Sequence, residues 1–444
     1  MKKIIVSLLI ISLGLLLKSC NTTEPPPPPP PPPPNGTTVH NTINLSVEWT
    51  DLYRIKLKWN ISTTDTINTF RYELSRKDEL GSETIKNFFI SGTDTSYIDG
   101  DIDSLASGKN YIYKVRAYDT SDKLIDTSRT LIAKTLAPTS HNIIWHIDTL
   151  GQPGDLGLLD VWGVDENNVW AVGGVNLPQS GTNVIKWDGT KWNYHSWPEG
   201  GARGIWGFSE NDIWTVGDYA NRGFIGHFNG SGWTEYRDDY FLVRGDTVYP
   251  LYSVWGSSPD NVWAVGDQGT IIRWDGSEWK KVQSPVNLLL YDIWGSSASD
   301  VYAIRFSLSQ NSQLIHFDGN IWTELTNQLP SGQRNFASLW FDKGGTGYIV
   351  GNNVLFYNGG VFNGIEINQD RFLLRVRGRI STDVFAVGQK GRVHHFNGSD
   401  WMTYPELFDE SPGMELRGVY VTETTVFTVG IINNGSIIYR GVRQ

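Results

Sequence analysis

The amino-acid sequence predicts an all-β protein, a small β-sandwich followed by a seven-bladed β-propeller. Residues 39–137 alternate between apolar and polar side chains with the period of two that half-buried strands show. From residue 157 onward, a Trp-Gly phrase followed by a Val-Gly phrase recurs at intervals of about 40 to 50 residues, which is the spacing of propeller blades. The prediction divides the chain into residues 1–19, 20–38, 39–137 and 141–444.

The composition is consistent with short strands and no disulfide bonds. The chain has 444 residues, of which 19% are charged and 13% aromatic, with 47 glycines and 19 tryptophans. Aromatic residues and glycines together indicate strands joined by tight turns. The formal net charge of −10 argues against a nucleic-acid partner and gives no reason to expect binding to anionic lipids. With a single cysteine, Cys20, the stability must come from a large core.

The first segment has the features of an export signal. Lys2 and Lys3 precede an apolar run over residues 4–17, which is too short to span a bilayer comfortably. The run ends in Leu17-Lys18-Ser19-Cys20, which resembles a bacterial lipoprotein cleavage box. The resemblance implies a signal peptide over residues 1–19 and lipidation of Cys20, which would anchor the chain in a membrane. The alternative is an ordinary signal peptide cleaved nearby.

A proline run over residues 25–34 follows the cysteine. Such a run forms an extended polyproline helix with about 3.1 Å per residue, so it would hold the folded part about 30 Å from the anchor. An unstructured tether is the alternative, and in both interpretations residues 20–38 are a spacer.

The segment over residues 39–137 has the length of a β-sandwich domain. Its motifs resemble those of a fibronectin type III domain: Trp59 matches the core tryptophan of strand B, residues 72–76 match strand C, residues 105–111 match the tyrosine corner, and residues 111–117 match strand F. The resemblance covers the whole segment. It implies a spacer or an adhesion module.

The repeat itself predicts four strands per unit. The first strand of each unit contains one aromatic residue or its substitute, and this column reads Trp162, Trp206, Trp255, Trp294, Trp340, Arg377 and Tyr420. An Asp-Gly or Asn-Gly pair follows the third strand of six units, as expected for a tight hairpin turn. We therefore expect every unit to be a four-stranded antiparallel sheet.

The two ends of this region predict how the ring closes. The last unit ends after three strands, while residues 143–148 form an extra strand before the first unit. Pairing of residues 143–148 with residues 436–440 would complete a seventh blade and remove an exposed edge. Six blades is the alternative, if the weak unit around Phe341 is not a blade. The repeat resembles bacterial Trp-Gly/Val-Gly propeller repeats and, more loosely, tectonin-type lectin propellers.

The blade topology separates short turns from long loops. The turns between the first and second strands and between the third and fourth strands share one face, the turn face. The remaining connections share the other, the loop face, and long insertions are expected there at residues 175–183, 238–250, 306–313 and 406–415. Candidate ligand-binding residues on the loop face are Arg203, Tyr252, Tyr291, Arg375, Arg417, Tyr240 and Tyr249. The alternative is that they are ordinary rim residues that make internal bonds.

Catalytic and metal sites are not expected. His227, His316 and His395 occupy the same column in different units, so they should spread around the turn face and not converge on a metal. The repeat tryptophans recur once per unit and are expected to be core. The acidic residues Asp238, Asp239, Asp409 and Glu410 of the loops are interpreted as solvated charge, with glycoside chemistry or calcium binding as alternatives. No cofactor motif is present.

These observations favour a monomeric binding protein at the cell surface or outer membrane, with a protein or glycan ligand on the loop face. A carbohydrate-active enzyme that uses acidic residues of the loops is one alternative. A scaffold protein of an envelope assembly is the other.

Overall fold

The structure is a computed structural model in which the following residues are described: 42–62, 71–78, 81, 83–89, 95–100, 104–151, 157–174, 184–195, 200–237, 240–241, 245–306, 312–330, 335–367, 369–433 and 435–444. The predicted signal peptide, Cys20 and the proline run lie outside these residues. Within the described part of the chain, no helix has the length and apolar character needed to cross a membrane.

The N-terminal part contains two antiparallel sheets. The first has the order β1 (Thr42–Thr50), β2 (Ile55–Ser62), β5 (Ser96–Asp99). The second has the order β4 (Glu83–Phe89), β3 (Arg71–Lys77), β6 (Asn110–Tyr118), β7 (Leu124–Thr127), and β8 (Leu131–Lys134) also pairs with β6. We call these two sheets the sandwich.

The core of the sandwich contains the residues that the alternating pattern predicted. Trp59 is buried and packs edge-on against Tyr72, with 5.4 Å between ring centroids. The hydroxyl of Tyr111 accepts a hydrogen bond of 2.8 Å from the amide of Ala106, five residues upstream. This is the contact expected of a tyrosine corner.

Seven four-stranded antiparallel sheets make up the rest of the described chain, and we refer to the strands of each sheet as A to D in order. The first three sheets have the following strands: β10 (Gly157–Asp165), β11 (Asn168–Gly174), β12 (Val184–Trp187), β13 (Trp192–His195); β14 (Gly201–Ser209), β15 (Asp212–Tyr219), β16 (Arg222–Phe228), β17 (Trp233–Tyr236); β18 (Leu251–Ser258), β19 (Asn261–Gly266), β20 (Ile271–Trp274), β21 (Trp279–Val282). A 3-10 turn, η1 (Asp267–Gly269), joins β19 to β20.

The next three sheets have the following strands: β22 (Leu290–Ser297), β23 (Asp300–Arg305), β24 (Gln313–Phe317), β25 (Trp322–Glu324); β26 (Phe336–Phe341), β27 (Gly347–Gly351), β28 (Val354–Asn358), β29 (Val361–Ile365); β30 (Leu373–Ile380), β31 (Asp383–Gly388), β32 (Val393–Phe396), β33 (Trp401–Thr403). The turns η2 (Thr326–Gln328) and η3 (Pro405–Leu407) follow β25 and β33.

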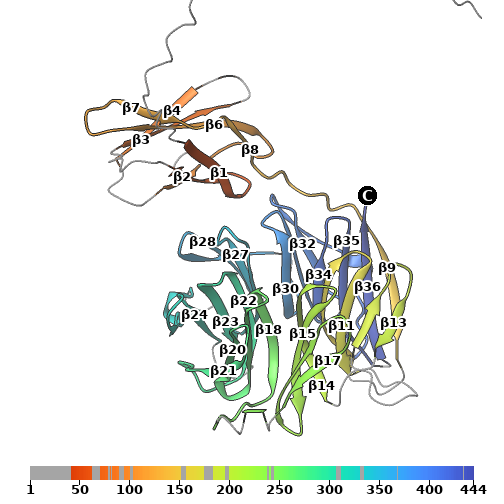
Figure 1. The fold of residues 1–444 in the computed structure, drawn as a ribbon. Helices are drawn as coiled ribbons and strands as arrows, with labels where there is room; N and C mark the ends of the chain where they lie inside the picture. Colours follow the sequence, from red (N-terminus) through yellow and green to blue (C-terminus); the bar gives the residue numbers. More distant parts are fainter. Residues whose placement is uncertain are drawn as a thin grey trace, which may run out of the picture.

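The last sheet is assembled from both ends of this region. Its strands are β34 (Glu415–Val421), β35 (Thr425–Ile432), β36 (Gly435–Arg443) and β9 (Ile143–Leu150). Strand β9 pairs with β36 from Ile143↔Arg443 to Leu150↔Ser436. The pairing predicted between residues 143–148 and residues 436–440 is therefore present, and Figure 1 shows β9 alongside β36.

The A strands surround a common axis. Each A strand contacts the A strand of the next sheet, and β34 contacts β10, so the sheets form a closed ring. The Trp-Gly phrase explains this contact. A Cβ atom at Gly207 would lie 2.6 Å from the ring of Trp162, and a Cβ atom at Gly163 would lie 2.7 Å from the ring of Tyr420. The glycine of one sheet thus makes room for the aromatic ring of the preceding sheet, and the contact between Tyr420 and Gly163 joins the last sheet to the first.

The sandwich lies against the turn face of the ring, near β27, β28, β30 and β32 (Figure 1). Arg54, in the β1–β2 connection, donates a hydrogen bond of 3.1 Å from Nη2 to the hydroxyl of Thr346 in the β26–β27 turn. The amide of Thr139 donates to the carbonyl of Asn397 in the β32–β33 turn at 2.9 Å. The opposite, loop face is consequently turned away from the sandwich.

Candidate functional site

A β-bulge recurs in every A strand and creates a column of residues on the loop face. In β18, for example, Leu251 pairs with Gly266 and Ser253 pairs with Val265, so Tyr252 is the extra residue between them. The same register shift occurs in all seven sheets. Bulges redirect side chains beside binding sites. The bulge column consists of Leu159, Arg203, Tyr252, Tyr291, Ala337, Leu374 and Arg417.

Four predicted site residues belong to the bulge column, and three of them are in contact. The guanidinium of Arg203 lies 4.6 Å from the centroid of the Tyr252 ring, and this ring lies 5.9 Å from that of Tyr291. The row continues to Phe306 at 5.4 Å and from there to Phe372 at 5.7 Å. We call these five half-buried residues the aromatic arc.

The arginines of the bulge column are already paired. Arg203 donates from Nε to Asp218 at 2.8 Å, and Arg417 donates from Nη2 to Glu415 at 2.6 Å. The loop face near these residues therefore presents aromatic rings and neutralised ion pairs, which suits a ligand with apolar or aromatic groups better than a free anion.

The remaining two tyrosines predicted at the site belong to the insertion before β18. The hydroxyl of Tyr240 accepts a hydrogen bond of 2.9 Å from the amide of Trp279, and its ring packs edge-on against Tyr236. Tyr240 thus pins the insertion to the sheets. Tyr249 is half-buried in the segment that leads into β18.

Arg375 lies one position after the bulge and points into the ring instead of onto the loop face. Its exposed fraction is 4%, and its guanidinium binds the carboxylate of Asp292 at 2.8 Å. Arg377 binds the same carboxylate through both terminal nitrogens, at 2.8 and 2.9 Å. Asp292 also accepts hydrogen bonds from the hydroxyls of Ser253 and Ser338. We call this group the channel cluster, and Arg375 is part of it, so it is not available to a ligand on the open face.

Burial and pairing have opposite effects on the carboxylates of the channel. Burial raises the pKa of Asp292, but the charges of Arg377 and Arg375 outweigh it and hold the pKa below its usual range. Burial also raises the pKa of Asp160, and there the more distant guanidinium of Arg375, at 3.5 Å, compensates only in part. Asp292 is therefore the ionised centre of the cluster.

The three histidines of the turn face play a structural role, and His395 also contacts His141 in the connection before β9. The Nε2 atom of each histidine contacts the carboxylate of an aspartate in the neighbouring B strand, and its ring stacks on an aromatic ring of that strand. The three sets are His227 with Asp212 and Trp214, His316 with Asp300 and Tyr302, and His395 with Asp383 and Phe385. They lie on three different sheets, and among the described residues no group of three or more His, Cys, Asp or Glu side chains could hold a metal ion.

His394, the neighbour of His395, should make the stability depend on pH. Burial lowers its pKa from 6.5 to about 4. The unfolded chain therefore takes up a proton as the pH falls below 6.5, whereas the folded chain does so only near pH 4. The stability due to neutral His394 is complete above pH 6.5 and falls by about 3 kcal/mol by pH 4.

Urea unfolding of wild type and His394→Gln between pH 7 and pH 4 measures this effect. The difference in unfolding free energy between the two proteins should shrink by about 3 kcal/mol over that interval. The comparison with the variant is necessary because Asp342 acts in the opposite direction: burial raises its pKa to about 6, so its contribution is lost as the pH rises from 4 to 6. Parallel curves for the two proteins would contradict the assignment to His394.

Of the four acidic residues considered for catalysis, Asp409 and Glu410 lie in the described part of the chain, and both make contacts within the fold. Glu410 binds Arg392 at 2.9 Å and Arg371 at 3.3 Å, and Asp409 accepts the amide of Ser411. Asp238 and Asp239 lie outside the described residues. The described carboxylates thus order the loop before β34.

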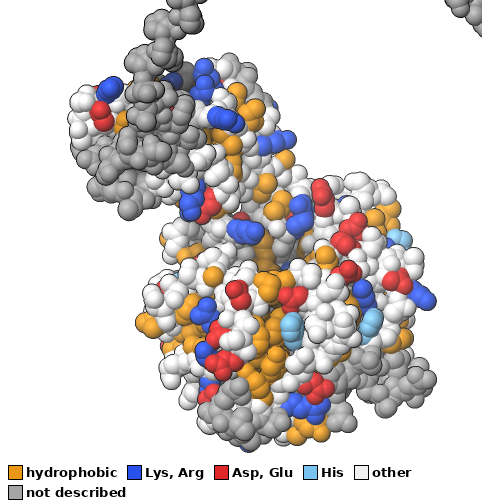
Figure 2. Space-filling model, viewed as in Figure 1, with side chains coloured by type: hydrophobic (Ala, Val, Ile, Leu, Met, Phe, Trp, Pro, Cys, Tyr) orange, Lys and Arg blue, Asp and Glu red, His pale blue; other side chains and the backbone are white. Residues whose placement is uncertain are grey.

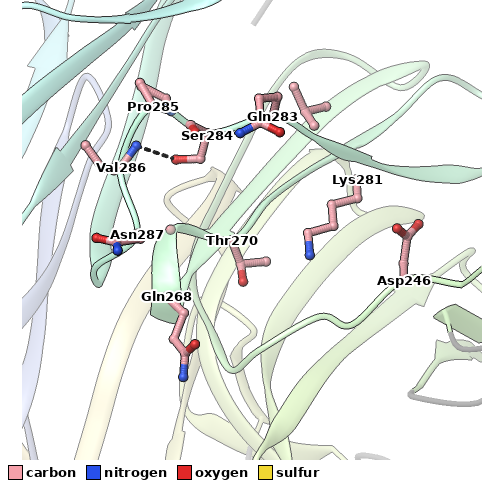
Figure 3. Close-up of a pocket in the computed structure, with 11 residues that line it drawn as sticks. Asp246, Gln268, Thr270, Lys281, Gln283, Ser284, Pro285, Val286 and Asn287 are labelled. Carbon is pink, nitrogen blue, oxygen red and sulfur yellow. Dashed lines mark hydrogen bonds between the residues drawn. The ribbon is translucent and has the colours of Figure 1, made fainter.

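A separate polar pocket of about 740 Å³ lies over the third sheet. Figure 3 shows its lining, which comes from the η1 turn, from β21 and from the segment after β21. Lys281 donates to the carbonyl of Thr247 across one side of it, and Val286 donates to the hydroxyl of Ser284 on another. The pocket is wide and its side chains are largely exposed. Its lining contains no aromatic side chain.

The solved structures that are similar to this chain include the following three. One is of YCF48 bound to D1 peptide, with 15% identity and a TM-score of 0.53 over 69% of this chain and 97% of that chain. Another is the WD40 β-propeller domain of Doa1, with 14% identity and a TM-score of 0.49 over 68% and 97%. The third is described as the extracellular domain of a hybrid two-component system from B. thetaiotaomicron, with 9% identity and a TM-score of 0.50 over 67% and 42%. The fold is shared with the YCF48 structure. The ring of four-stranded antiparallel sheets is itself the architecture of a β-propeller.

No protein-family model and no curated protein matches the sequence. At the identities of the three structures, the likeness shows the fold alone.

Sequence reasoning did not identify Phe306 and Phe372 as site residues. Both lie immediately outside a strand, Phe306 after β23 and Phe372 before β30, where the repeat phrase gives no signal. The bulge column can be located from the sequence. Each bulge residue stands three positions before the aromatic residue of its A strand, or before the residue that replaces this aromatic residue.

Proposed function

We propose that this protein is a lipid-anchored binding module whose ring forms a seven-bladed propeller that holds a protein segment on the loop face. Cys20 would carry the anchor, residues 20–38 would act as the spacer, and residues 39–137 would be a fibronectin type III-like domain between the spacer and the propeller. This arrangement would display the binding face at the cell surface.

The observation that carries this proposal is the bulge column. It places aromatic and arginine side chains on the face that the sandwich leaves open, and in the aromatic arc they touch one another. Tyrosine and phenylalanine rings provide large contact area with few rotatable bonds, and they are enriched in protein interfaces. YCF48 was solved with a D1 peptide, so a peptide is a ligand class that this fold accommodates.

The test is selection from a random dodecapeptide display library, with a glycan array in parallel, using the full chain in detergent micelles. We expect enriched peptides whose affinity falls about 10- to 100-fold in the Tyr252→Ala/Tyr291→Ala variant, because each lost aromatic contact costs about 1 kcal/mol beyond its buried area. Tyr194→Ala is the matched control, since Tyr194 is an exposed tyrosine on the outer strand β13.

Two results would count against the proposal. Peptides that bind the double variant and the wild type equally would place the ligand elsewhere. Retention of glycans, with loss in the double variant and no enriched peptides, would replace the protein ligand with a carbohydrate one.

A further inference from the structure

The outer edge of the last sheet differs from the outer edges of the other six. Strand β9 is the outermost strand there and has 8 residues, whereas β13, β17, β21, β25, β29 and β33 have 3 to 5. Strand β9 contains no lysine or proline, the residues that commonly protect an edge from pairing. Figure 1 shows β9 at the periphery of the ring, and Figure 2 shows hydrophobic, histidine and charged side chains mixed on that side of the molecule.

The backbone groups of every second residue of β9 point away from its sheet. The amide of Gln444 donates to the carbonyl of Asn142, so Asn142 and the even positions of β9 form the hydrogen-bonded pairs with β36. The amide and carbonyl groups at positions 143, 145, 147 and 149 therefore face outward. Within the described part of the chain, none of these outward groups has a hydrogen-bond partner. Strand β9 thus presents an unpaired edge that is long enough to bind another strand.

The side chains of β9 leave apolar surface uncovered beside this edge. Ile144 and Ile147 are 46% and 54% exposed. They lie on opposite faces of the sheet, because side chains alternate along a strand. A strand that pairs with β9 would therefore cover an isoleucine on each face.

The charged groups of this region include basic side chains without a carboxylate. Arg440 of β36 pairs with His146, so both side chains lie in one row on the same face of the sheet. The Nε atom of Arg440 is buried without a hydrogen-bond partner among the described residues, and His146 is exposed. Asp148 lies two positions further along β9 and forms no ion pair within the described ranges. An acidic side chain from an added strand would complete the row of Arg440 and His146.

The sequence of β9 is complementary to itself when two copies pair antiparallel about a twofold axis at Ile147. A twofold axis makes every contact twice, and it lets the outward odd positions of the two strands exchange hydrogen bonds. This register places apolar residues opposite apolar residues and the histidine opposite the aspartate. The pairs are Ile147 with Ile147 of the second copy, His146 with Asp148, Trp145 with Thr149, and Ile144 with Leu150.

The neighbouring registers are less favourable. An axis at position 146 would oppose His146 to His146 of the second copy, and an axis at position 148 would oppose two aspartates. Like charges directly opposite each other destabilise strand pairs. The axis at position 147 instead adds Asp148 of the second copy to the row of Arg440 and His146.

Although the sequence favours a monomer, we propose that this protein forms a twofold dimer in which β9 of one copy pairs with β9 of a second copy. The two last sheets then become one continuous sheet. Because the two strands run in opposite directions, the loop faces of the two rings point in opposite directions and both stay open. Dimerisation is therefore independent of the ligand proposed for the loop face.

Sedimentation velocity of the full chain in a density-matched detergent, from about 1 to 100 µM, tests this proposal. We expect the dimer fraction to rise with concentration. Ile147→Lys replaces the apolar pair on the axis with two like charges, so it should weaken dimerisation at least tenfold. Val361→Lys is the matched control, since Val361 is 55% exposed on the outer strand β29, and it should leave dimerisation unchanged.

An exchange of the two charged residues tests the register. His146→Asp brings two carboxylates together and should weaken dimerisation tenfold or more. His146→Asp/Asp148→His restores opposite partners in the same register, so its dissociation constant should return to within about threefold of the wild-type value. These positions are exposed or partly exposed, so the melting temperatures should stay within about 2 °C of the wild-type value.

Three results would overturn the proposal. The first is a monomer at every concentration. The second is an equal dimer fraction in Ile147→Lys, Val361→Lys and the wild type, which would assign the association to the membrane anchor or to another surface. The third is a double exchange that dimerises no better than His146→Asp alone.

Discussion

Replacement of Asp292 by alanine should lower the free energy of unfolding by about 3 to 5 kcal/mol, because the variant leaves Arg377 without a counter-ion and Arg375 with only the more distant carboxylate of Asp160. Asp292 has no exposed surface and binds Arg375 and Arg377 together. In the wild-type protein the hydroxyls of Ser253 and Ser338 donate hydrogen bonds to this carboxylate, and the variant leaves both without that acceptor. Urea unfolding at pH 7, followed by circular dichroism, measures the loss.

Two variants make this prediction specific. Asp318→Ala removes an aspartate from an exposed turn and should change the unfolding free energy by much less. Asp292→Ala/Arg377→Trp removes one of the stranded charges and restores the aromatic residue of that column, so it should be more stable than Asp292→Ala alone. If the double variant were the less stable of the two, the charge of Arg377 would not be the cause of the loss.

The strands and their closure could be predicted because they depend on local patterns. Alternation with a period of two gives the strands, and the Asp-Gly and Asn-Gly pairs give the hairpins. The ring closure could be predicted because one repeat unit lacks a fourth strand, while residues 143–148 form a strand that belongs to no other unit. Each of these signals lies within a few residues of the element it specifies.

The channel could not be predicted in the same way, since its side chains meet across sheets. Arg375 is polar and stands next to the bulge column, so the sequence predicts a ligand-binding position on the loop face for Arg375 as it does for Arg203. Only the ring shows that Asp292, 83 positions earlier, lies within 2.8 Å of it. The repeated column did contain a clue: Arg377 replaces an aromatic residue, and a buried arginine requires a buried carboxylate.

The partial exposure of two repeat tryptophans could not be predicted for a related reason. The repeat tryptophans were expected to be core, and Trp162, Trp255 and Trp340 are buried as expected. Trp206 and Trp294 differ because the space each would fill is restricted by Phe208 and Phe341. The position of residues 48–50 over these tryptophans depends on how the sandwich lies on the ring, and no pattern within either part specifies that contact.

Deletion of residues 435–444 should abolish the stable ring or lower its unfolding free energy by more than about 5 kcal/mol. Strand β36 lies between β35 and β9, so its loss exposes the edges of both neighbours and detaches the strand that closes the last sheet. The deletion also removes Ile437, Ile438 and Tyr439, which are almost completely buried and contribute about 1.5 to 3 kcal/mol each.

Thermal unfolding monitored by circular dichroism, with gel filtration, measures the loss, and deletion of the exposed Gln444 alone is the control. A synthetic peptide of residues 435–444 added to the truncated chain should restore part of the melting temperature, because the gap between β35 and β9 accepts a strand of that register. An unchanged melting temperature after the deletion would mean that the ring does not depend on the pairing of its two ends.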